Sequence, residues 1–460
     1  MSMGISPPIL AMLALAGCAL APAYSPPTMP LPTSLGQDAA RWPDVDWWRG
    51  FGNEELAVLI AEAQANNTDI AAAAARVDQA GAGLRIARAP LLPAINLSGN
   101  ALHQGANSSS GASSGSYAYA ELGASWEADL WGRLRAQARS AHAALAASRF
   151  DAEAVRLGVA AQVAETWLTA VELRERHAIA VDNLANARTL LSQASARLRA
   201  GEALAGDVAA QRAVVAEAEA QIAAFDRADA AALASLAILL GRPAQGFAIA
   251  AVSLDAIVPP AIARPGLPAE LLARRPDIAA AAAALTAAGA DVQAARAAML
   301  PKISLSATGG GQIGTGPSEA LYNLVAGLTQ PLFDHGALAG QRDLAMGIRR
   351  EREAEYRGVV LAALGDVERS LKAIGQLDRE AAARVMAADE AARALAEVQA
   401  RYRAGSEDMV AVLDAERTLF SARDARAAIR AERLRASVAL YEALGGGWVD
   451  PTPHAAVYNP

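Results

Sequence analysis

Three glycines are the first candidates for chemistry. Gly309, Gly311 and Gly314 have the G-x-G-x-x-G spacing of a dinucleotide-binding turn, and Asp334 follows 20 residues after Gly314. A helix must open directly after such a turn, but Thr-Gly-Pro-Ser follows here, so we exclude a nucleotide site. No metal-ligand spacing connects the five histidines, which are His103, His142, His177, His335 and His454. The sequence therefore predicts no enzyme, no metal and no bound cofactor.

The single cysteine, Cys18, offers a different chemistry. It follows a Leu-Ala-Gly tripeptide and an apolar stretch at 9–17 that is too short to span a bilayer and is typical of a signal peptide core. The motif resembles a bacterial lipobox, whose cysteine thiol carries a diacylglycerol. We expect residues 1–17 to be a lipoprotein signal peptide, and Cys18 to become the lipid-modified N-terminus with its diacylglycerol and palmitate. Residues 1–17 lack Lys and Arg, so the usual positive segment is missing; the alternative is a buried free cysteine.

The amino-acid composition predicts the type of secondary structure that positions the candidate residues. The 460 residues are 53% hydrophobic but only 5% aromatic, because alanine supplies much of the apolar content. Alanine is the best helix former, so we expect long and closely packed helices. The net charge of -7 gives no basic surface for nucleic acid, and one cysteine excludes an intrachain disulfide. Beyond residue 21 no apolar run approaches the ~18 residues of a membrane-spanning helix.

Proline and glycine landmarks recur at a fixed spacing through the chain. The repeated segments are Leu92-Pro93 with Leu300-Pro301 and 69–75 with 277–283, both offset by 208, and Leu240-Gly241 with Leu444-Gly445, 199–201 with 403–405 and Gly132 with Gly336, all offset by 204. The chain is therefore predicted to be a tandem internal repeat of about 205 residues per half. The expected domains are a lipidated N-terminal linker at 18–50, repeats at 51–247 and 269–447, an inter-repeat equatorial segment at 248–268 and an equatorial tail at 448–460.

Each half predicts the same order of elements. A helix at about 53–88 or 269–298 ends at the Leu-Pro pair, since proline cannot continue a helix. The sequence then predicts an alternating strand near 95–101 or 303–307, a Gly/Ser-rich loop at 105–116 or 309–318, and a second strand near 117–130 or 320–333.

A long helical run follows, from Gly132 to Gly201 or from Gly336 to Gly405. At ~1.5 Å per residue each run is roughly 100 Å long. After the glycine turn a helix of about 37 residues returns, and glycine ends it. The returning and opening helices together match the long helix, so we expect them to stack end to end beside it. Valine or Trp at every fourth position over 155–171 predicts neighbours on both sides, rather than a two-stranded coiled coil.

The predicted strands require an assembly. Each is about 10 residues, which is the length of a tilted transmembrane strand. A membrane barrel needs about eight strands or more and cannot leave an edge open, so several chains must pool their four strands. Six aromatic residues near the strand ends are consistent with an interfacial girdle, or alternatively with a soluble β-region: Tyr117, Tyr119, Trp126, Trp131, Tyr322 and Phe333.

Motifs along nearly the whole chain resemble one family. They are the lipobox at Cys18, Trp47-Trp48 with Phe51-Gly52 and Leu56, the run Leu-Leu-Ala-Arg-Arg-Pro-Asp-Ile at 271–278, Gln-Pro-Leu-Phe-Asp at 330–334, Val-Leu-Asp-Ala at 412–415, and Leu-Tyr-Glu-Ala-Leu-Gly-Gly-Gly-Trp at 440–448. The chain thereby resembles the TolC-type outer-membrane efflux channels, in the lipoprotein branch of OprM and NodT.

This resemblance implies both the fold and the function. The fold class is mainly α with a membrane β-barrel: a homotrimer pools four strands per chain into a 12-stranded outer-membrane barrel, continued by a periplasmic 12-helix α-barrel. The implied function is efflux transmembrane transport, in which the channel is the exit duct of a tripartite system for multidrug efflux or export. Its partners are a periplasmic adaptor and an inner-membrane RND-type pump, and the protein is lipid-anchored in the outer membrane.

The resemblance also assigns roles near the glycine turns. Asp414 matches an aspartate whose copies ring a periplasmic, iris-like gate, and a carboxylate ring repels anions. Val410, one turn earlier, matches an apolar position that could plug the opening. Asp207 and Tyr402 match a hydrogen-bonded pair that holds neighbouring hairpins shut. Without the resemblance, the default interpretation of Asp414 is a solvated charge on an amphipathic helix.

The match is incomplete at two positions. A second gate aspartate of some family members is Ala411 here, and an arginine that joins the closing contact is Glu407. The turns themselves, with Gly201, Leu204 and Gly405, are expected to meet the helical tips of the adaptor.

Two alternatives have different sequence signatures. A periplasmic adaptor lipoprotein should show one long hairpin flanked by β-rich modules, whereas this chain predicts two equal hairpins. A structural coiled-coil lipoprotein without channel activity would not need four strands of membrane length.

Overall fold

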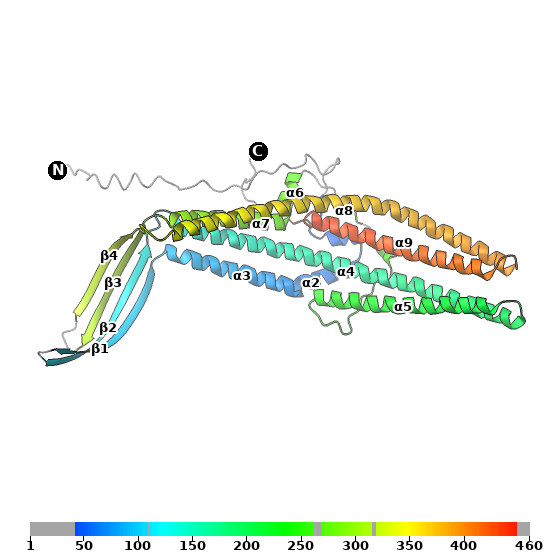
Figure 1. The fold of residues 1–460 in the computed structure, drawn as a ribbon, viewed down its shortest axis with the longest axis horizontal. Helices are drawn as coiled ribbons and strands as arrows, with labels where there is room; N and C mark the ends of the chain where they lie inside the picture. The colour runs from blue at the N-terminus through cyan, green and yellow to red at the C-terminus, as the bar shows by residue number, and fades with distance from the viewer. Residues whose placement is uncertain are drawn as a thin grey trace.

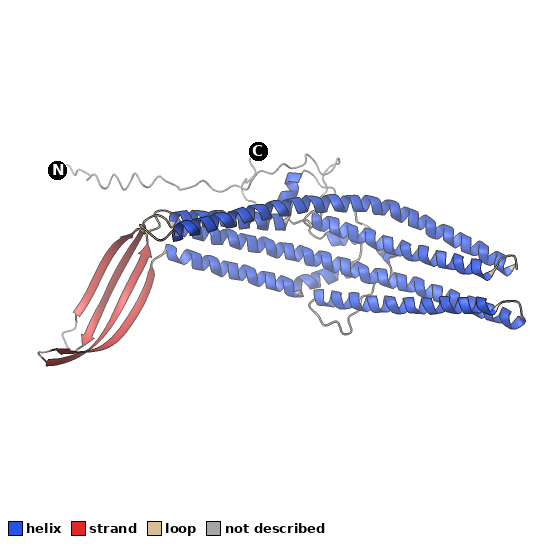
Figure 2. Cartoon of the chain, in the orientation of Figure 1, coloured by secondary structure: helices blue, strands red, loops and turns tan. Residues whose placement is uncertain are grey.

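The computed structural model describes residues 42–108, 111–258, 260–261, 263, 268–314 and 319–448. This part of the chain is elongated and mostly helical, with a curled sheet at one end and two helical hairpin turns at the other (Figure 1; Figure 2). The helices are α2 (Glu54–Asn66), α3 (Thr68–Arg88), α4 (Arg133–Ala200), α5 (Ala205–Leu239), α6 (Pro268–Arg274), α7 (Pro276–Ala297), α8 (Ala337–Arg403) and α9 (Met409–Ala443). The strands are β1 (Ala94–Ser108), β2 (Gly111–Glu127), β3 (Lys302–Gly314) and β4 (Glu319–Thr329).

The long helices agree with the prediction. α4 has 68 residues and α8 has 67, so each is roughly 100 Å long, and α5 and α9 return with 35 residues each. Gly201 ends α4 in the left-handed region at φ +78°, and its N–H bonds the carbonyls of Arg197 and Leu198. Only glycine adopts this conformation without strain, which is why the chain turns there.

The predicted opening helices are each broken in two. The helix expected at 53–88 is interrupted at Asn67, whose side-chain oxygen accepts hydrogen bonds from the N–H groups of Asp69 and Ile70 and so starts α3. The helix expected at 269–298 is interrupted at Arg275, because Pro276 pushes the preceding residue into an extended conformation. The uninterrupted helices of the prediction were therefore wrong at these two residues.

The sheet extends further than the sequence predicts. Its four strands pair antiparallel in the order β1-β2-β3-β4 and contain 15, 17, 13 and 11 residues. Most of the loop expected at 105–116 and the first part of that at 309–318 are strand, while the second strands end earlier, at Glu127 and Thr329. The Gly and Ser residues read as turn signals, but a ladder of main-chain hydrogen bonds does not require large side chains.

The helices form adjacent columns. α2, α3 and α5 lie along α4, while α7 and α9 lie between α4 and α8 (Figure 1). The end-to-end stacking of short helices beside each long one, and the neighbours on both sides of α4, are as predicted. α7 is long and apolar enough to cross a membrane by length and composition, but it packs against α4 and α8, and 44% of its most apolar window is buried. Its apolar residues therefore serve helix packing.

The largest hydrophobic core lies at mid-length, where the short helices meet. Trp167 of α4 is fully buried there, and its indole N–H donates to the Glu55 carboxylate at 3.1 Å. Glu55 also accepts from the N–H groups of Ala250 and Ala251, and so fixes the segment between the two halves. The largest fully buried side chains of this core include Phe51, Leu56, Ile60, Leu168, Leu240 and Leu254.

Candidate functional site

The two faces of the sheet differ in chemistry. A row is the set of four residues, one from each strand, that pair across the sheet. Two rows on one face are Ile95-Ala124-Ala307-Leu324 and Leu97-Leu122-Gly309-Tyr322. Two rows on the other face are Asn96-Gly123-Thr308-Asn323 and Ser98-Glu121-Gly310-Leu321. On the apolar face Leu97 and Leu324 are 77% and 75% exposed, and no described helix covers them. Exposure of such a patch to water costs about 25 cal/mol per Å². The sheet therefore suits lipid on one side and water on the other.

Both edges of the sheet are open. Within the described chain, β1 pairs only with β2 and β4 pairs only with β3. Each edge strand thus carries main-chain N–H and C=O groups without a strand partner. Hydrocarbon offers such groups no hydrogen bonds, so a sheet placed in a membrane must close on further strands.

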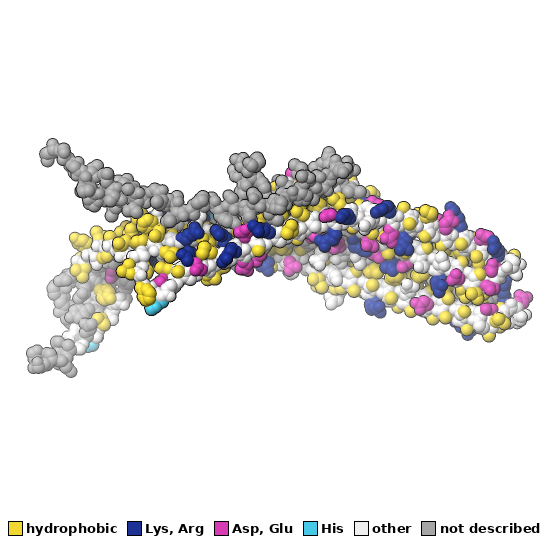
Figure 3. All heavy atoms as spheres, turned by 45° about the horizontal axis from the view of Figure 1, so that its top comes forward, with side chains coloured by type: hydrophobic (Ala, Val, Ile, Leu, Met, Phe, Trp, Pro, Cys, Tyr) yellow, Lys and Arg dark blue, Asp and Glu magenta, His cyan; other side chains and the backbone are white. Residues whose placement is uncertain are grey.

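Aromatic residues mark the end of the sheet that joins the helices. Trp126 donates its indole N–H to the carbonyl of Leu91 at 3.1 Å, and Trp131 donates to that of Pro301 at 2.7 Å. Phe333 is exposed in the segment after β4. The predicted girdle is incomplete, because Tyr119 pairs with Asn100 and Gln312 on the polar face rather than on the apolar one. Hydrophobic side chains gather at this end, whereas charged ones are distributed along the helices (Figure 3).

Ion pairs fix α4 to the base of the sheet. Glu127, the last residue of β2, binds Arg133 at 2.8 Å and Lys302 at 2.9 Å. Asp129 accepts hydrogen bonds from the N–H groups of Leu134 and Arg135 at the start of α4. The long helix therefore leaves the sheet in a fixed direction.

The predicted adaptor-contact residues lie at the end of the molecule opposite the sheet (Figure 1). Gly201 and Gly405 occupy the two turns with positive φ, and a Cβ on either would meet nothing within 4 Å. Leu204 is exposed directly before α5. An exposed leucine beside an open turn is a surface on which a partner helix could pack.

The predicted gate residues Asp414 and Val410 lie one turn apart on α9. Val410 is 64% exposed, and the Asp414 side chain is exposed too. Asp414 accepts a hydrogen bond at 3.0 Å from Arg417, a neighbour that sequence reasoning missed. This exposed pair lies on one helix three residues apart, and such pairs contribute little to stability. Its effect is on charge, because Arg417 offsets the negative field of Asp414.

The predicted closing pair is not joined within one chain. The Asp207 carboxylate accepts from the N–H of Leu204 at 3.1 Å and so caps the start of α5. Tyr402 is buried in a second hydrophobic cluster near the turns, and the Arg197 guanidinium lies 4.3 Å from its ring centroid. Asp207 and Tyr402 therefore have separate partners in the described chain.

Glu416 was not predicted, although it lies two residues after Asp414. Its side chain is 6% exposed, and its Oε2 atom has no hydrogen-bond partner among the residues that the structure describes. It lines a small cavity between α4, α8 and α9 with Asn183, Asn186 and Arg423. Burial raises the pKa of this carboxyl from 4.5 to about 7. The sequence indicates this residue only by its spacing: two residues along a helix from Asp414, it lies on the opposite face.

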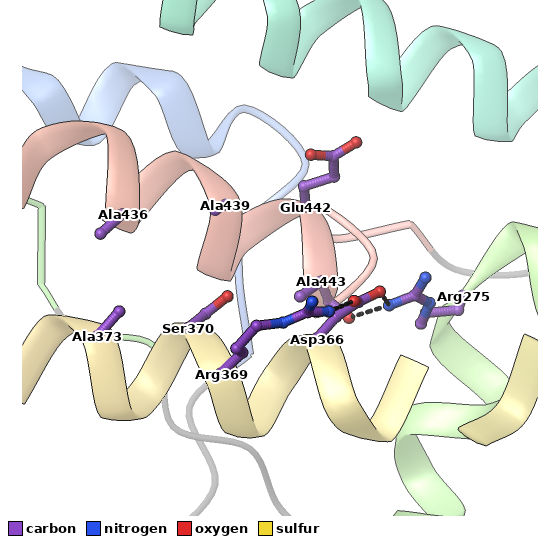
Figure 4. Close-up of a pocket in the computed structure, with 9 residues that line it drawn as sticks. All are labelled: Arg275, Asp366, Arg369, Ser370, Ala373, Ala436, Ala439, Glu442 and Ala443. Atoms are coloured by element: carbon purple, nitrogen blue, oxygen red, sulfur yellow. Dashed lines mark hydrogen bonds and ion pairs between the residues drawn. The ribbon is translucent and has the colours of Figure 1, made fainter. Parts of the chain in front are cut away.

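A surface cavity of about 440 Å³ lies at the junction of α7, α8 and α9 (Figure 4). Arg275 at its edge binds Asp277 at 2.7 Å, Asp366 at 3.5 Å and the carbonyl of Ala443 at 3.0 Å. Its charge is thus already matched by side chains of the junction, and we assign the cavity no ligand. Among the described residues, no group of three or more His, Cys, Asp or Glu side chains is placed to hold a metal. Cys18 lies outside the described residues.

Comparisons with known proteins agree with this geometry. The model of the outer membrane efflux protein family matches residues 59–242 and 267–446. The pyoverdine export outer membrane protein OpmQ of Pseudomonas aeruginosa is 40% identical over 460 residues, with 96% of each chain covered. The outer-membrane channel OprN has a TM-score of 0.87 at 27% identity, covering 94% of this chain and 100% of that one. The open-state MtrE channel of Neisseria gonorrhoeae has a TM-score of 0.82 at 28% identity, covering 94% and 98%.

These relatives and structures are channels, which points to transport rather than catalysis. A sheet suited to lipid on one face and water on the other, carried at the end of helices roughly 100 Å long, is what a duct through an outer membrane requires. The chain belongs to the outer membrane efflux protein family, and it is an outer-membrane exit duct for exported molecules.

Proposed function

We propose that three copies of this chain form one duct of a tripartite export system. Their sheets would close into a 12-stranded barrel, and their helices would continue it as a 12-helix tunnel across the periplasm. The observation that carries the proposal is the two-faced sheet with both edges open. Four strands cannot enclose water alone, whereas twelve can.

The helical columns support the same assembly. α8 and the column of α3 and α5 lie at opposite sides of the described chain, each with neighbours on one side only. Apolar side chains remain exposed on both, for example Leu361 on α8 and Ile238 on α5. Contact of these sides between copies would bury them, as the strand edges would be paired.

The gate and the adaptor surface are proposed at the hairpin turns. Asp414 and Val410 are exposed one helical turn apart, as two levels of a narrow opening would be. Gly201, Leu204 and Gly405 offer the contact surface for a periplasmic adaptor, which would link the duct to an inner-membrane RND-type pump. Since Asp207 and Tyr402 do not bond each other within a chain, their closing contact would form between neighbouring copies.

Cysteine crosslinking tests the assembly directly. Cys18→Ser gives a chain without cysteine, into which pairs can be introduced. Asn100→Cys on β1 with single cysteines at successive positions of β4 should link different copies, and oxidation should give dimers and trimers in denaturing gels. The control pair is Asn100→Cys with Tyr119→Cys, which lie opposite each other within one sheet and should stay monomeric. Monomers from every edge pair would contradict a closed barrel.

The cargo follows from a relative rather than from the geometry. OpmQ, 40% identical over nearly the whole chain, carries a name that assigns it to pyoverdine export. We propose a secreted siderophore as the cargo of this duct. A deletion strain should retain the siderophore in its periplasm and release it again when the intact gene is restored. Normal secretion by the deletion strain would exclude this cargo.

A further inference from the structure

Glu121 on the polar face of the sheet is a charge without a described ion-pair partner. Glu121 on β2 lies in a row between Ser98 on β1 and Gly310 on β3. Among the described side chains it forms no ion pair. The other acidic side chain described on this face, Glu127, is bound by Arg133 and Lys302 at the base of the sheet. Glu121 is therefore a carboxylate that no described side chain pairs with, on the polar face away from that base.

The residues paired with Glu121 across the sheet are small, although its side chain is half-buried. Ser98 is small, and Gly310 has no side chain at all. A Cβ on Gly310 would strike the carbonyl oxygen of Ala120, so the close approach of β2 and β3 at this row requires glycine. A larger neighbour, which could shield the carboxylate, does not fit there.

Glu121 lies at the depth of the lipid-facing side chains. The next residue, Leu122, is exposed on the opposite face, between Trp126 nearer the helices and Ile313 nearer the strand ends. A carboxylate at this depth is tolerated only on a face that meets water, because hydrocarbon does not solvate it. The position of Glu121 thus places water on the polar face at mid-membrane.

We propose that Glu121 is a charge-selectivity determinant in the membrane barrel, where its copies form an acidic ring that favours cations and retards anions. This inference rests on the proposed closure of several copies around one lumen. Each copy adds a carboxylate to the same level of that lumen, and charged rings set the ion selectivity of pores. The ring is separate from Asp414, because the two residues lie at opposite ends of the long helices.

Single-channel recording in planar bilayers tests this ring. At about 0.1 M salt the Debye length is about 10 Å, so the ring should act across much of a narrow lumen. Glu121→Gln should lower the cation-to-anion permeability ratio about twofold or more and leave conductance within the same range. Glu121→Asp should preserve the ratio.

Chemical modification of the inserted channel separates the effect of charge from an effect of the substitution on folding. Glu121→Cys in the Cys18→Ser background can be inserted first and then treated from the outer side with anionic or cationic methanethiosulfonate. The anionic reagent should restore cation preference, and the cationic one should reverse it. An unchanged ratio in Glu121→Gln would overturn the proposal. Absence of any channel in the wild-type protein would instead refute the duct assembly.

Discussion

Asn67 donates its side-chain amide to the main-chain carbonyl of Leu239 at 2.8 Å, and so joins the start of α3 to the end of α5. Arg275 makes the corresponding bond to the carbonyl of Ala443 at 3.0 Å, between the start of α7 and the end of α9. Positions 67 and 275 are offset by 208, and positions 239 and 443 by 204, the same offsets as the proline and glycine landmarks. The Asn67 amide and the Arg275 guanidinium thus each donate a hydrogen bond to the carbonyl at the end of the returning helix.

Glycines complete both junctions. Gly241 and Gly445 follow α5 and α9 with positive φ, and a Cβ on either would strike a main-chain carbonyl, that of Asn66 or Arg274. The two halves therefore share the close approach of chain segments as well as the side-chain bond.

Removal of the Asn67 bond should destabilise the protein. Asn67→Ala loses a helix cap and leaves the buried Leu239 carbonyl unsatisfied, which should lower the free energy of unfolding by about 2–3 kcal/mol. Asn53 is a control, because it caps α2 without a second bond of this kind. Asn53→Ala should cost only about 1 kcal/mol. Denaturant unfolding of the detergent-extracted protein, followed by circular dichroism, measures both; equal losses would show that the junction bond contributes nothing.

The proposed gate should respond in opposite directions to two neighbouring substitutions. Asp414→Ala should weaken cation selectivity and block by multivalent cations from the periplasmic side, because it removes the carboxylate ring. Arg417→Ala should strengthen both, since Arg417 now pairs with Asp414 at 3.0 Å. Asp414→Glu keeps the charge and serves as the control. If bilayer recordings show no change in either alanine variant, the constriction lies elsewhere along the tunnel.

Packing near the gate should loosen as pH rises. The folded-state pKa of Glu416, about 7, lies above the ordinary 4.5, so the buried carboxyl is neutral in acid and becomes charged as pH passes through 7. The stabilisation is thus complete below pH 4.5 and is lost above pH 7. Glu416→Gln should remove this dependence and stabilise the seam of α4 and α9 at pH 8 by about 2–3 kcal/mol per chain.

Hydrogen exchange at pH 5.5 and pH 8, corrected for intrinsic rates, measures this effect on α9. Glu432→Gln is the control, because Glu432 is exposed on the same helix. Equal protection of the wild type at both pH values would exclude a role for Glu416 ionisation.

Lipidation should be dispensable for insertion. Cys18→Ser should abolish labelling by radioactive palmitate, yet the protein should remain in the outer membrane, because its strands hold it there. Mass spectrometry of the mature wild-type N-terminus checks the same site. A mature chain that begins elsewhere, with an unmodified Cys18, contradicts the lipoprotein assignment.

The sequence predicts the large features because single residues enforce them. Gly201 and Gly405 end the long helices, and the Leu-Pro pairs at 92–93 and 300–301 end the shorter ones, each through backbone constraints that need no partner. The helix break at Asn67 could not be predicted from the local sequence, because the Asn67 amide is held there by a hydrogen bond to the carbonyl of Leu239, 172 residues away. A hydrogen bond between residues so far apart produces no pattern in the local sequence.

The candidate site residues differ in the same way. The family motif predicts a role for Asp414, but it does not point to Arg417 and Glu416 beside it, because their contacts depend on which helix face is exposed and which is packed. The strands were underestimated because Gly, Ala and Ser at 105–116 and 309–314 resemble a loop in composition. Their pairing depends on the neighbouring strand rather than on their own side chains.

The breaks at Asn67 and Arg275 give the molecule continuous columns beside interrupted ones. α4 and α8 run without interruption from the sheet to the turns, while the columns beside them are jointed halfway. α5 beyond its joint is a lever of 35 residues, about 50 Å long, so a tilt of about 5° at Leu239 would move its far end by about 5 Å. Such a tilt would leave α3 and the attached strands in place, so the proposed duct could widen at the hairpin turns without a change in its proposed barrel.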